Sequence, residues 1–213
     1  MEAILQWDGQ ALLFIQEHIR QVWMDGFWKT ITHLGDAGWF WIILGIVLLI
    51  PKKTRKAGIA ALAALAIGAL ITNVALKNII ARIRPYEVVE GLKLLIEPQS
   101  DFSFPSGHTS NAFLGAHMAY KEFKDSSPIL AYSGYAIAAF VAGSRLYNNR
   151  HWVADVVAGA GFGILSVELS YLIYFPIRNA IARRINRNVK NCPIVAAPVF
   201  SSNMAGFYLT YQF

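Results

Sequence analysis

An imidazole and a carboxylate stand four residues apart at His151 and Asp155, where a long apolar run begins. On a helix, side chains at this spacing share one face. A histidine that donates one ring N–H to a carboxylate keeps its other nitrogen unprotonated, and that nitrogen can serve as a nucleophile or a general base. Taken alone, the pair is more often a solvated helix entry, because so short a motif has little specificity. Its neighbours decide between the two interpretations.

Several residues have the chemistry of an anion site. Lys77 and Arg84 are seven residues apart, which predicts that both lie on one stripe of a helix. Arg84 and Arg145 each offer parallel N–H donors to a phosphoryl group. Ser106 and Gly107 are predicted at a helix N-terminus, where free backbone N–H groups and the helix dipole favour anions.

His108 follows this helix start and is placed to protonate a leaving oxygen. Other interpretations stay open for the neighbouring residues. Lys77 and Arg84 can extend toward lipid headgroups, and Ser106 can serve only as an N-cap. We favour a phosphate site because three separate clusters fall on one predicted face.

The composition points to a membrane protein. The 213 residues are 55% hydrophobic and only 15% charged, whereas about a quarter of residues are charged in soluble domains. The net charge of +6 does not predict nucleic-acid binding, because the basic residues lie in short clusters between apolar runs. The single Cys192 excludes an intramolecular disulfide and a Cys-rich metal site. We expect no cleavable signal peptide, no metal and no cofactor, with membrane lipids as partners and the oligomeric state left open.

The hydrophobic pattern predicts an all-α fold, a polytopic transmembrane bundle of about five spans. We divide the chain into an N-terminal amphipathic helix at the membrane surface (1–28), a transmembrane domain (29–178) and a basic C-terminal tail (179–213). The five spans are predicted at 32–50, 57–80, 105–120, 128–143 and 151–174. The first is extended back to Thr32, past His33 and Asp36, because the uncharged run 37–50 is shorter than the about 20 residues that a span needs. Alternating aromatic residues in 206–213 fit either a strand or a tail lying on the membrane.

Basic residues predict the orientation, because short cytoplasmic loops are rich in Lys and Arg. They follow the first and third spans and fill the C-terminal tail: Lys52, Lys53, Arg55, Lys56, Lys121, Lys124, Arg178, Arg183, Arg184, Arg187 and Lys190. The candidate site residues then fall on the opposite, extracytoplasmic face of the cell membrane.

Three motifs occur in order. Six residues separate Lys77 from Arg84-Pro85, and Pro105-Ser106-Gly107-His108 follows. Five residues then separate Ser144-Arg145 from His151, and three more separate His151 from Asp155. This arrangement resembles the three-part signature of the type 2 phosphatidic acid phosphatase superfamily, the lipid phosphate phosphatases. The resemblance covers residues 77–155 directly, and the hydrophobic layout extends it to about 30–176.

The resemblance implies a metal-independent hydrolase. In it, His151 attacks phosphorus and forms a phosphohistidine, Asp155 holds the imidazole ring, and His108 is the general acid. The phosphoryl oxygens are bound by the remaining matched residues, Lys77, Arg84, Ser106, Gly107 and Arg145. These roles agree with the stabilisation of a phosphoryl group in transfer by dense positive charge. Arg82 and Arg150 lie outside the signature and are left only as candidates for headgroup contacts.

Three other functions are compatible with parts of this pattern. Vanadate-dependent haloperoxidases share the signature, but they are larger soluble proteins. A small transporter of a lipid or of phosphate would also carry intramembrane charges, yet here the charges cluster at one face. An inactive relative is disfavoured because every signature side chain is present. The substrate stays open between undecaprenyl diphosphate, a lipid A phosphate and a glycerophospholipid phosphate, and the predicted orientation favours the first two.

Overall fold

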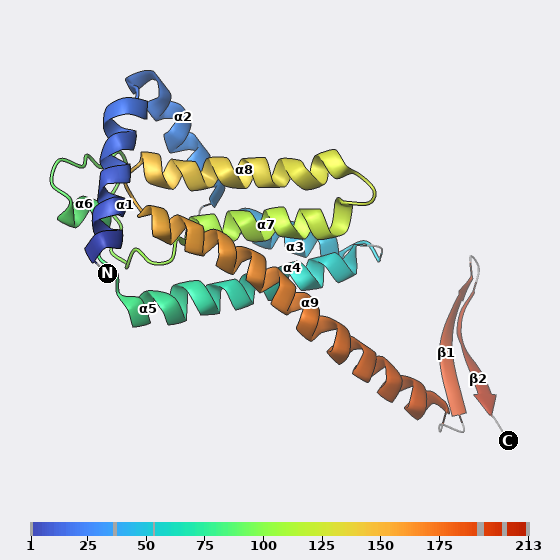
Figure 1. The fold of residues 1–213 in the computed structure, drawn as a ribbon. Coiled ribbons are helices and arrows are strands. Elements are labelled where there is room, and N and C mark those ends of the chain that lie inside the picture. The colour runs from blue at the N-terminus through green and yellow to red at the C-terminus, as the bar shows by residue number, and fades with distance from the viewer. Residues whose placement is uncertain (1, 36–37, 53, 191–193, 202–203, 212–213) are drawn as a thin grey trace. The chain divides into compact units, whose positions relative to one another are not determined.

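The computed structural model describes residues 2–35, 38–52, 54–190, 194–201 and 204–211 (Figure 1). Asp36, Lys53 and Cys192, which the sequence predictions use, lie outside the described residues. The chain divides into two compact units, Met1–Tyr171 and Leu172–Phe213. The first unit is a bundle of helices, as predicted, and it carries the candidate site residues.

The N-terminal part is helical but broken. Its elements are α1 (Glu2–Phe14), a π-helical turn (Ile15–Ile19), α2 (Val22–Thr32), a 3-10 turn (His33–Gly35) and α3 (Trp39–Leu49). The prediction of one continuous span from Thr32 is wrong, because α3 begins only at Trp39 and its axis is bent by 45° from the preceding helix. Gly38 has φ of 71°, a left-handed conformation that glycine adopts without steric cost.

The predicted second span is confirmed. It consists of α4 (Arg55–Ala69), a π-helical stretch (Leu70–Leu76) and α5 (Lys77–Ile80), which follow one another without a gap. The helix ends at Ala81, whose φ is 47°. Arg84 therefore lies beyond the helix in extended backbone, just before the short α6 (Pro85–Val88). The expectation that Lys77 and Arg84 share one helical stripe is wrong.

The last three helices of the bundle begin within two residues of their predicted starts. They are α7 (Gly107–Phe123), α8 (Pro128–Tyr147) and α9 (Val153–Lys190). Ser106 is the N-cap of α7, and Pro128 occupies the first turn of α8, where its missing N–H has no helical partner to lose. All three helices continue past their predicted ends.

Close packing of α9 on α7 brings two parts of the signature together. A Cβ atom at Gly159 would lie 2.6 Å from the Ser106 carbonyl oxygen, and one at Gly163 would lie 2.3 Å from the Ser110 carbonyl oxygen. Small residues four positions apart allow helices in membranes to approach this closely. As a result, the Ser106 N–H donates to the Asp155 carbonyl oxygen at 3.0 Å.

Within the described residues, three stretches are long and apolar enough to cross a membrane: Arg55–Val88, Pro128–Tyr147 and Val153–Ile181. The bent pair of α2 and α3 makes a fourth if it is counted as one span. The transmembrane bundle is thus confirmed, whereas the number of five spans stays a prediction. The predicted third span, α7, is not among these stretches, and it carries buried polar residues such as Ser110 and His117.

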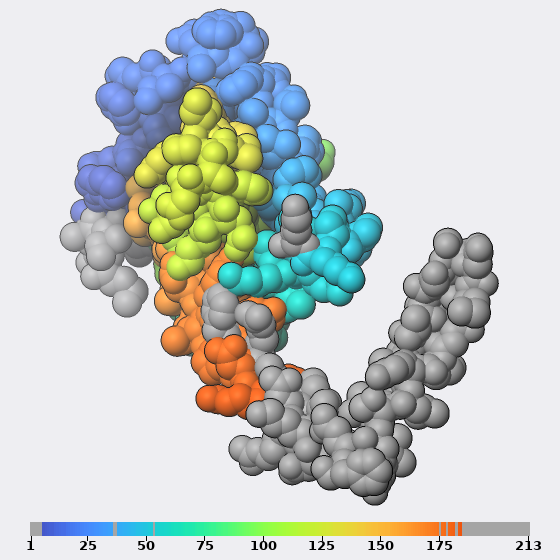
Figure 2. Space-filling view, turned by 90° about the vertical axis from the view of Figure 1, so that its right-hand side faces the viewer, coloured from blue at the N-terminus to red at the C-terminus, as the bar shows by residue number. Residues whose placement is uncertain are grey.

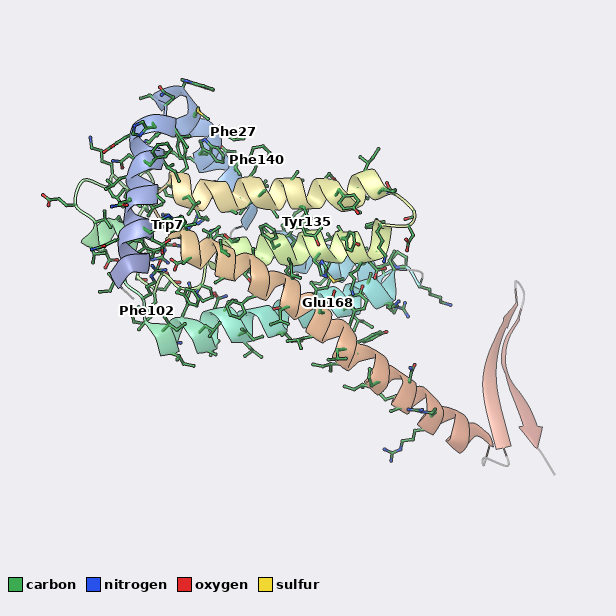
Figure 3. The ribbon with its side chains drawn as sticks, in the orientation of Figure 1. Trp7, Phe27, Phe102, Tyr135, Phe140 and Glu168 are labelled. Atoms are coloured by element: carbon green, nitrogen blue, oxygen red, sulfur yellow. The ribbon has the colours of Figure 1, made fainter. Side chains whose placement is uncertain are left out.

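A polar cluster ties α7, α8 and α9 together away from the candidate site residues. Figure 3 labels two of its members, Tyr135 and Glu168. The two ring nitrogens of His117 lie 2.5 Å from the Tyr135 hydroxyl and 2.7 Å from a Glu168 carboxylate oxygen. Lys121 donates to the other oxygen of Glu168 at 2.8 Å. One cluster thus links three helices.

The second unit contains an antiparallel hairpin of β1 (Ile194–Ser201) and β2 (Met204–Tyr211), in which Ile194 pairs with Tyr211. Of the two interpretations of the tail, the structure contains the strand.

Candidate active site

The candidate residues gather at one end of the bundle, where α5 ends, α7 and α9 begin and α8 ends (Figure 1). A cavity of about 270 Å³ opens there. Its lining residues are Gly35, Asn73, Lys77, Gln99, Asp101, Gly107, His108, Asn111 and His151. Four residues singled out from the sequence therefore share one cavity: Lys77, Gly107, His108 and His151.

His151 lies just before α9 and not within it, so the expected helical pair with Asp155 has a different geometry. Its Nδ1 atom is 2.9 Å from the Ser103 carbonyl oxygen and 3.5 Å from Asp155 Oδ2. A carbonyl oxygen only accepts hydrogen bonds, so Nδ1 carries the proton and Nε2 keeps its lone pair. The Nε2 atom lies 3.4 Å from Arg84 Nη1. The backbone of Ser103 is thus the nearer acceptor, and Asp155 the second.

The surroundings of His151 keep its ring neutral. Burial lowers its pKa well below 6.5, and the positive charges of Arg145, Arg84, His108 and Lys77 lower the pKa further. Burial penalises the charged imidazolium, and like charges oppose it. The unprotonated form, which has the nucleophilic nitrogen, therefore prevails at neutral pH.

Asp155 is fully buried and holds the segments around His151. Its Oδ2 atom accepts from the Ser103 hydroxyl and, at 3.0 Å, from the Trp152 backbone N–H. Its Oδ1 atom accepts from Arg82 Nη1 at 2.7 Å. Arg82 was only a candidate for headgroup contacts, and its guanidinium binds this buried carboxylate instead. Arg150, the other candidate, is only 7% exposed.

Lys77 and Arg84 converge on Asp101. Arg84 is 1% exposed; its Nη2 atom lies 2.5 Å from Asp101 Oδ1, and Lys77 donates to Oδ2 of the same carboxylate. Partial burial alone would raise the pKa of Asp101, but hydrogen bonds and charges from Lys77 and Arg84 lower it to about 2. The ionised carboxylate thus occupies a position that suits two oxygens of a phosphoryl group.

The other phosphate-binding candidates lie around this centre. A Cβ atom at Gly107 would lie 3.0 Å from Asn73 Oδ1, so glycine permits a close approach there. The Ser106 hydroxyl is buried and accepts from Thr109 N at 3.4 Å, which is the N-cap interpretation. Ser106 is absent from the cavity lining. Arg145 faces a neighbouring cavity of about 390 Å³, which shares His108 and Gln99 with the first.

Sequence reasoning did not assign roles to Asp101, Ser103, Asn73 and Asn111. Two of them carried a signal in their spacing. Asn73 stands four residues before Lys77, and Asn111 stands three after His108, so each lies on the same helical face as a signature residue. Asp101 and Ser103 lie in an irregular loop, where spacing carries no such information.

Residues 57–179 match the family model of the PAP2 superfamily. The chain belongs to this superfamily. It is 48% identical to a lipid A 1-phosphatase of Porphyromonas gingivalis over 71 residues. This matched stretch covers 33% of this chain and 16% of that protein. It is 35% identical to an undecaprenyl-diphosphatase of Sulfolobus acidocaldarius over 133 residues. This second match covers 61% of this chain and 63% of that protein.

A transmembrane PAP2-type phosphatidylglycerolphosphate phosphatase from Bacillus subtilis has a similar crystal structure, with a TM-score of 0.67 and 29% identity. The match covers 80% of this chain and 86% of that one. This PAP2 protein spans only 16% and 63% of the two curated relatives above. Its apolar helices and its likeness to a transmembrane PAP2 enzyme make it a membrane protein.

Proposed function

We propose that this PAP2 protein is an integral-membrane phosphatase that hydrolyses a phosphate monoester or diphosphate of a membrane lipid. The observation that carries the proposal is the setting of His151. Its Nε2 atom keeps a lone pair 3.4 Å from the Arg84 guanidinium, in a cavity shared with Lys77 and His108. A neutral nucleophile beside fixed positive charges suits attack on an anionic phosphoryl group.

The reaction has two steps. His151 Nε2 forms a bond to phosphorus while the bond from phosphorus to the lipid oxygen breaks, and His108 protonates that leaving oxygen. Lys77 and Arg84 bind the phosphoryl oxygens once the substrate displaces the Asp101 carboxylate from them. Water then attacks the phosphohistidine and transfers a proton to His108, which releases inorganic phosphate and restores His151.

An apolar cavity supports a lipid substrate. It measures about 270 Å³, and residues of α3, α4 and α7 line it, among them Trp41, Leu65 and Gly115. Gly115 stands four residues after Asn111, which lines the phosphate cavity. The two cavities therefore border successive turns of α7, and a hydrocarbon chain attached to the bound phosphate can enter the second. The names of the relatives agree with this class, since they include a lipid A phosphatase and an undecaprenyl-diphosphatase.

Charge distribution supports an extracytoplasmic site. Figure 2 views the bundle toward the end where α4 begins and where α7 turns into α8. Lys52, Lys56, Lys121 and Lys124 stand in or beside these connections, away from the cavity of His151. Because basic loops stay in the cytoplasm, the catalytic end faces outward, which favours undecaprenyl diphosphate or a lipid A phosphate.

Phosphate release from a panel of lipids by the purified protein in detergent tests this function. The panel comprises undecaprenyl diphosphate, a lipid A phosphate, phosphatidic acid and phosphatidylglycerol phosphate, with glycerol 3-phosphate as the control that lacks a hydrocarbon chain. We expect release from at least one lipid, none from that lipid with His151→Ala, and far less from glycerol 3-phosphate. Release from none of the lipids, or equal release by the variant, would contradict the proposal.

A further inference from the structure

The N-terminal helix carries a buried carboxylate that reaches the candidate active site. Asp8, on α1, has a side chain that is 0% exposed. Its Oδ2 atom lies 2.7 Å from Arg82 Nη2, and its Oδ1 atom accepts from the Ala154 backbone N–H at 3.2 Å. Figure 3 labels its neighbour Trp7 on this part of α1. Asp8 thus binds both the segment after α5 and the first turn of α9.

Arg82 joins this carboxylate to Asp155. Its two terminal nitrogens bind one carboxylate each, both at 2.7 Å, and the side chain is 15% exposed. The guanidinium also lies over the Trp152 ring, 4.7 Å from the ring centroid. A planar guanidinium has donors in a fixed fork, so it can bridge two carboxylates at set positions, which a lysine cannot do.

The side chain and the backbone of Arg82 are each connected to His151 through hydrogen bonds. Its side chain fixes Asp155, which accepts from the Ser103 hydroxyl. Its backbone carbonyl oxygen accepts from the Ser103 N–H at 2.8 Å. The Ser103 carbonyl oxygen, in turn, lies 2.9 Å from His151 Nδ1 and sets the ring's tautomer. A shift of Arg82 would therefore move the acceptor that orients the nucleophile.

We propose that Asp8 and Arg82 are positioning residues that hold Ser103 and Asp155 in place, and through them keep His151 in the tautomer that leaves Nε2 free to attack. The inference rests on the proposed phosphatase function. It gives the N-terminal helix a part in catalysis, in place of the purely interfacial role expected from its sequence. Neither residue lines the cavity, so neither contacts the phosphoryl group.

The variant Asp8→Asn tests this role, because it keeps the size of the side chain but removes the charge that holds Arg82. We expect kcat to fall by about 10- to 100-fold, the range that small displacements of reacting groups produce. The KM and the inhibition constant of inorganic phosphate should stay within about twofold of the wild-type values, since Lys77 and Arg84 are unchanged.

Arg82→Lys should lower kcat with the same pattern, because one ammonium cannot hold both carboxylates. Glu17→Gln, an equal change of charge at an exposed position of the N-terminal segment, is the matched control and should leave kcat unchanged.

A second readout does not depend on turnover. NMR of ¹⁵N-labelled histidines in detergent, with the His151 signals assigned by their loss in His151→Ala, should show a proton on Nδ1 in the wild type. In Asp8→Asn we expect a mixture with the Nε2-protonated tautomer. An unchanged tautomer, an unchanged kcat, or equal rises in KM and the phosphate inhibition constant would each overturn the inference. If the wild type hydrolyses no lipid phosphate, the proposed function fails, and the tautomer alone decides whether Asp8 positions His151.

Discussion

The Asp101 carboxylate lies 2.5 Å from Arg84 Nη2 and also accepts from Lys77, so one acidic side chain covers both cations that are proposed to bind phosphate. With a pKa lowered to about 2, it is ionised at any pH at which the protein would work. A phosphoryl group must therefore compete with an internal anion of similar geometry.

Replacing this carboxylate should strengthen anion binding. In Asp101→Asn, we expect the inhibition constant of inorganic phosphate to fall about fivefold, because a partly exposed ion pair contributes on the order of 1 kcal/mol. Competition assays with wild type and variant measure the change, and Glu90→Gln, in the same loop, serves as the control. A higher inhibition constant in Asp101→Asn would mean that Asp101 instead holds Lys77 and Arg84 in place for the substrate.

The pH dependence of kcat/KM should show that His151 acts in its neutral form. His151 attacks only when unprotonated, and its pKa is lowered well below 6.5, so kcat/KM should be lost only as the pH falls through that lowered value. Lys77→Gln removes one of the charges that lower this pKa, so its acid limb should move to higher pH. Both profiles use the same substrate, which cancels the substrate's own titration. A wild-type acid limb at or above pH 6.5 would disagree with this view of His151.

Chelators should not inhibit. Among the described residues, no three His, Cys, Asp or Glu side chains are grouped so as to hold a metal ion, and Lys77 and Arg84 supply the positive charge at the site. We expect full activity after dialysis against EDTA, and inhibition by vanadate, which takes the five-coordinate geometry of phosphoryl transfer. Loss of activity in EDTA that a divalent ion restores would refute this prediction.

The orientation of the chain can be measured directly. A reporter that is active only outside the cytoplasm should work when it is inserted within 88–100 and fail when it is fused after Arg187. The reverse pattern would place the site on the cytoplasmic face and would favour inner-leaflet lipids as substrates.

Sequence patterns predicted those helix boundaries that carry a clear local signal. The starts of α7 and α8 follow from Ser106 as N-cap and from Pro128. The break before α3 was missed, because a rule based on span length favoured one long helix, whereas the backbone turns at Gly38. The predicted end of the second span near Ile80 was right, but the shared stripe of Lys77 and Arg84 was not, since a turn at an alanine with positive φ has no signature in the sequence.

Long-range contacts explain the rest of the difference. Arg82 meets residues that are 74 and 73 positions away in the sequence, Asp8 and Asp155. In the sequence, Asp8 is only an interruption of an apolar pattern, and no periodicity relates it to the signature. The signature gathered the groups proposed to contact phosphate, whereas the groups that orient His151 became visible only once the helices were packed.

The most direct test of the central claim is the detection of phosphate on His151 itself. Wild-type protein and His151→Ala are mixed with a lipid phosphate that the wild type hydrolyses, quenched in alkali to preserve phosphohistidine, and analysed by peptide mass spectrometry. We predict a phosphorylated peptide containing His151 in the wild type and none in His151→Ala. Phosphate on another residue, or turnover by His151→Ala, would contradict the proposed mechanism.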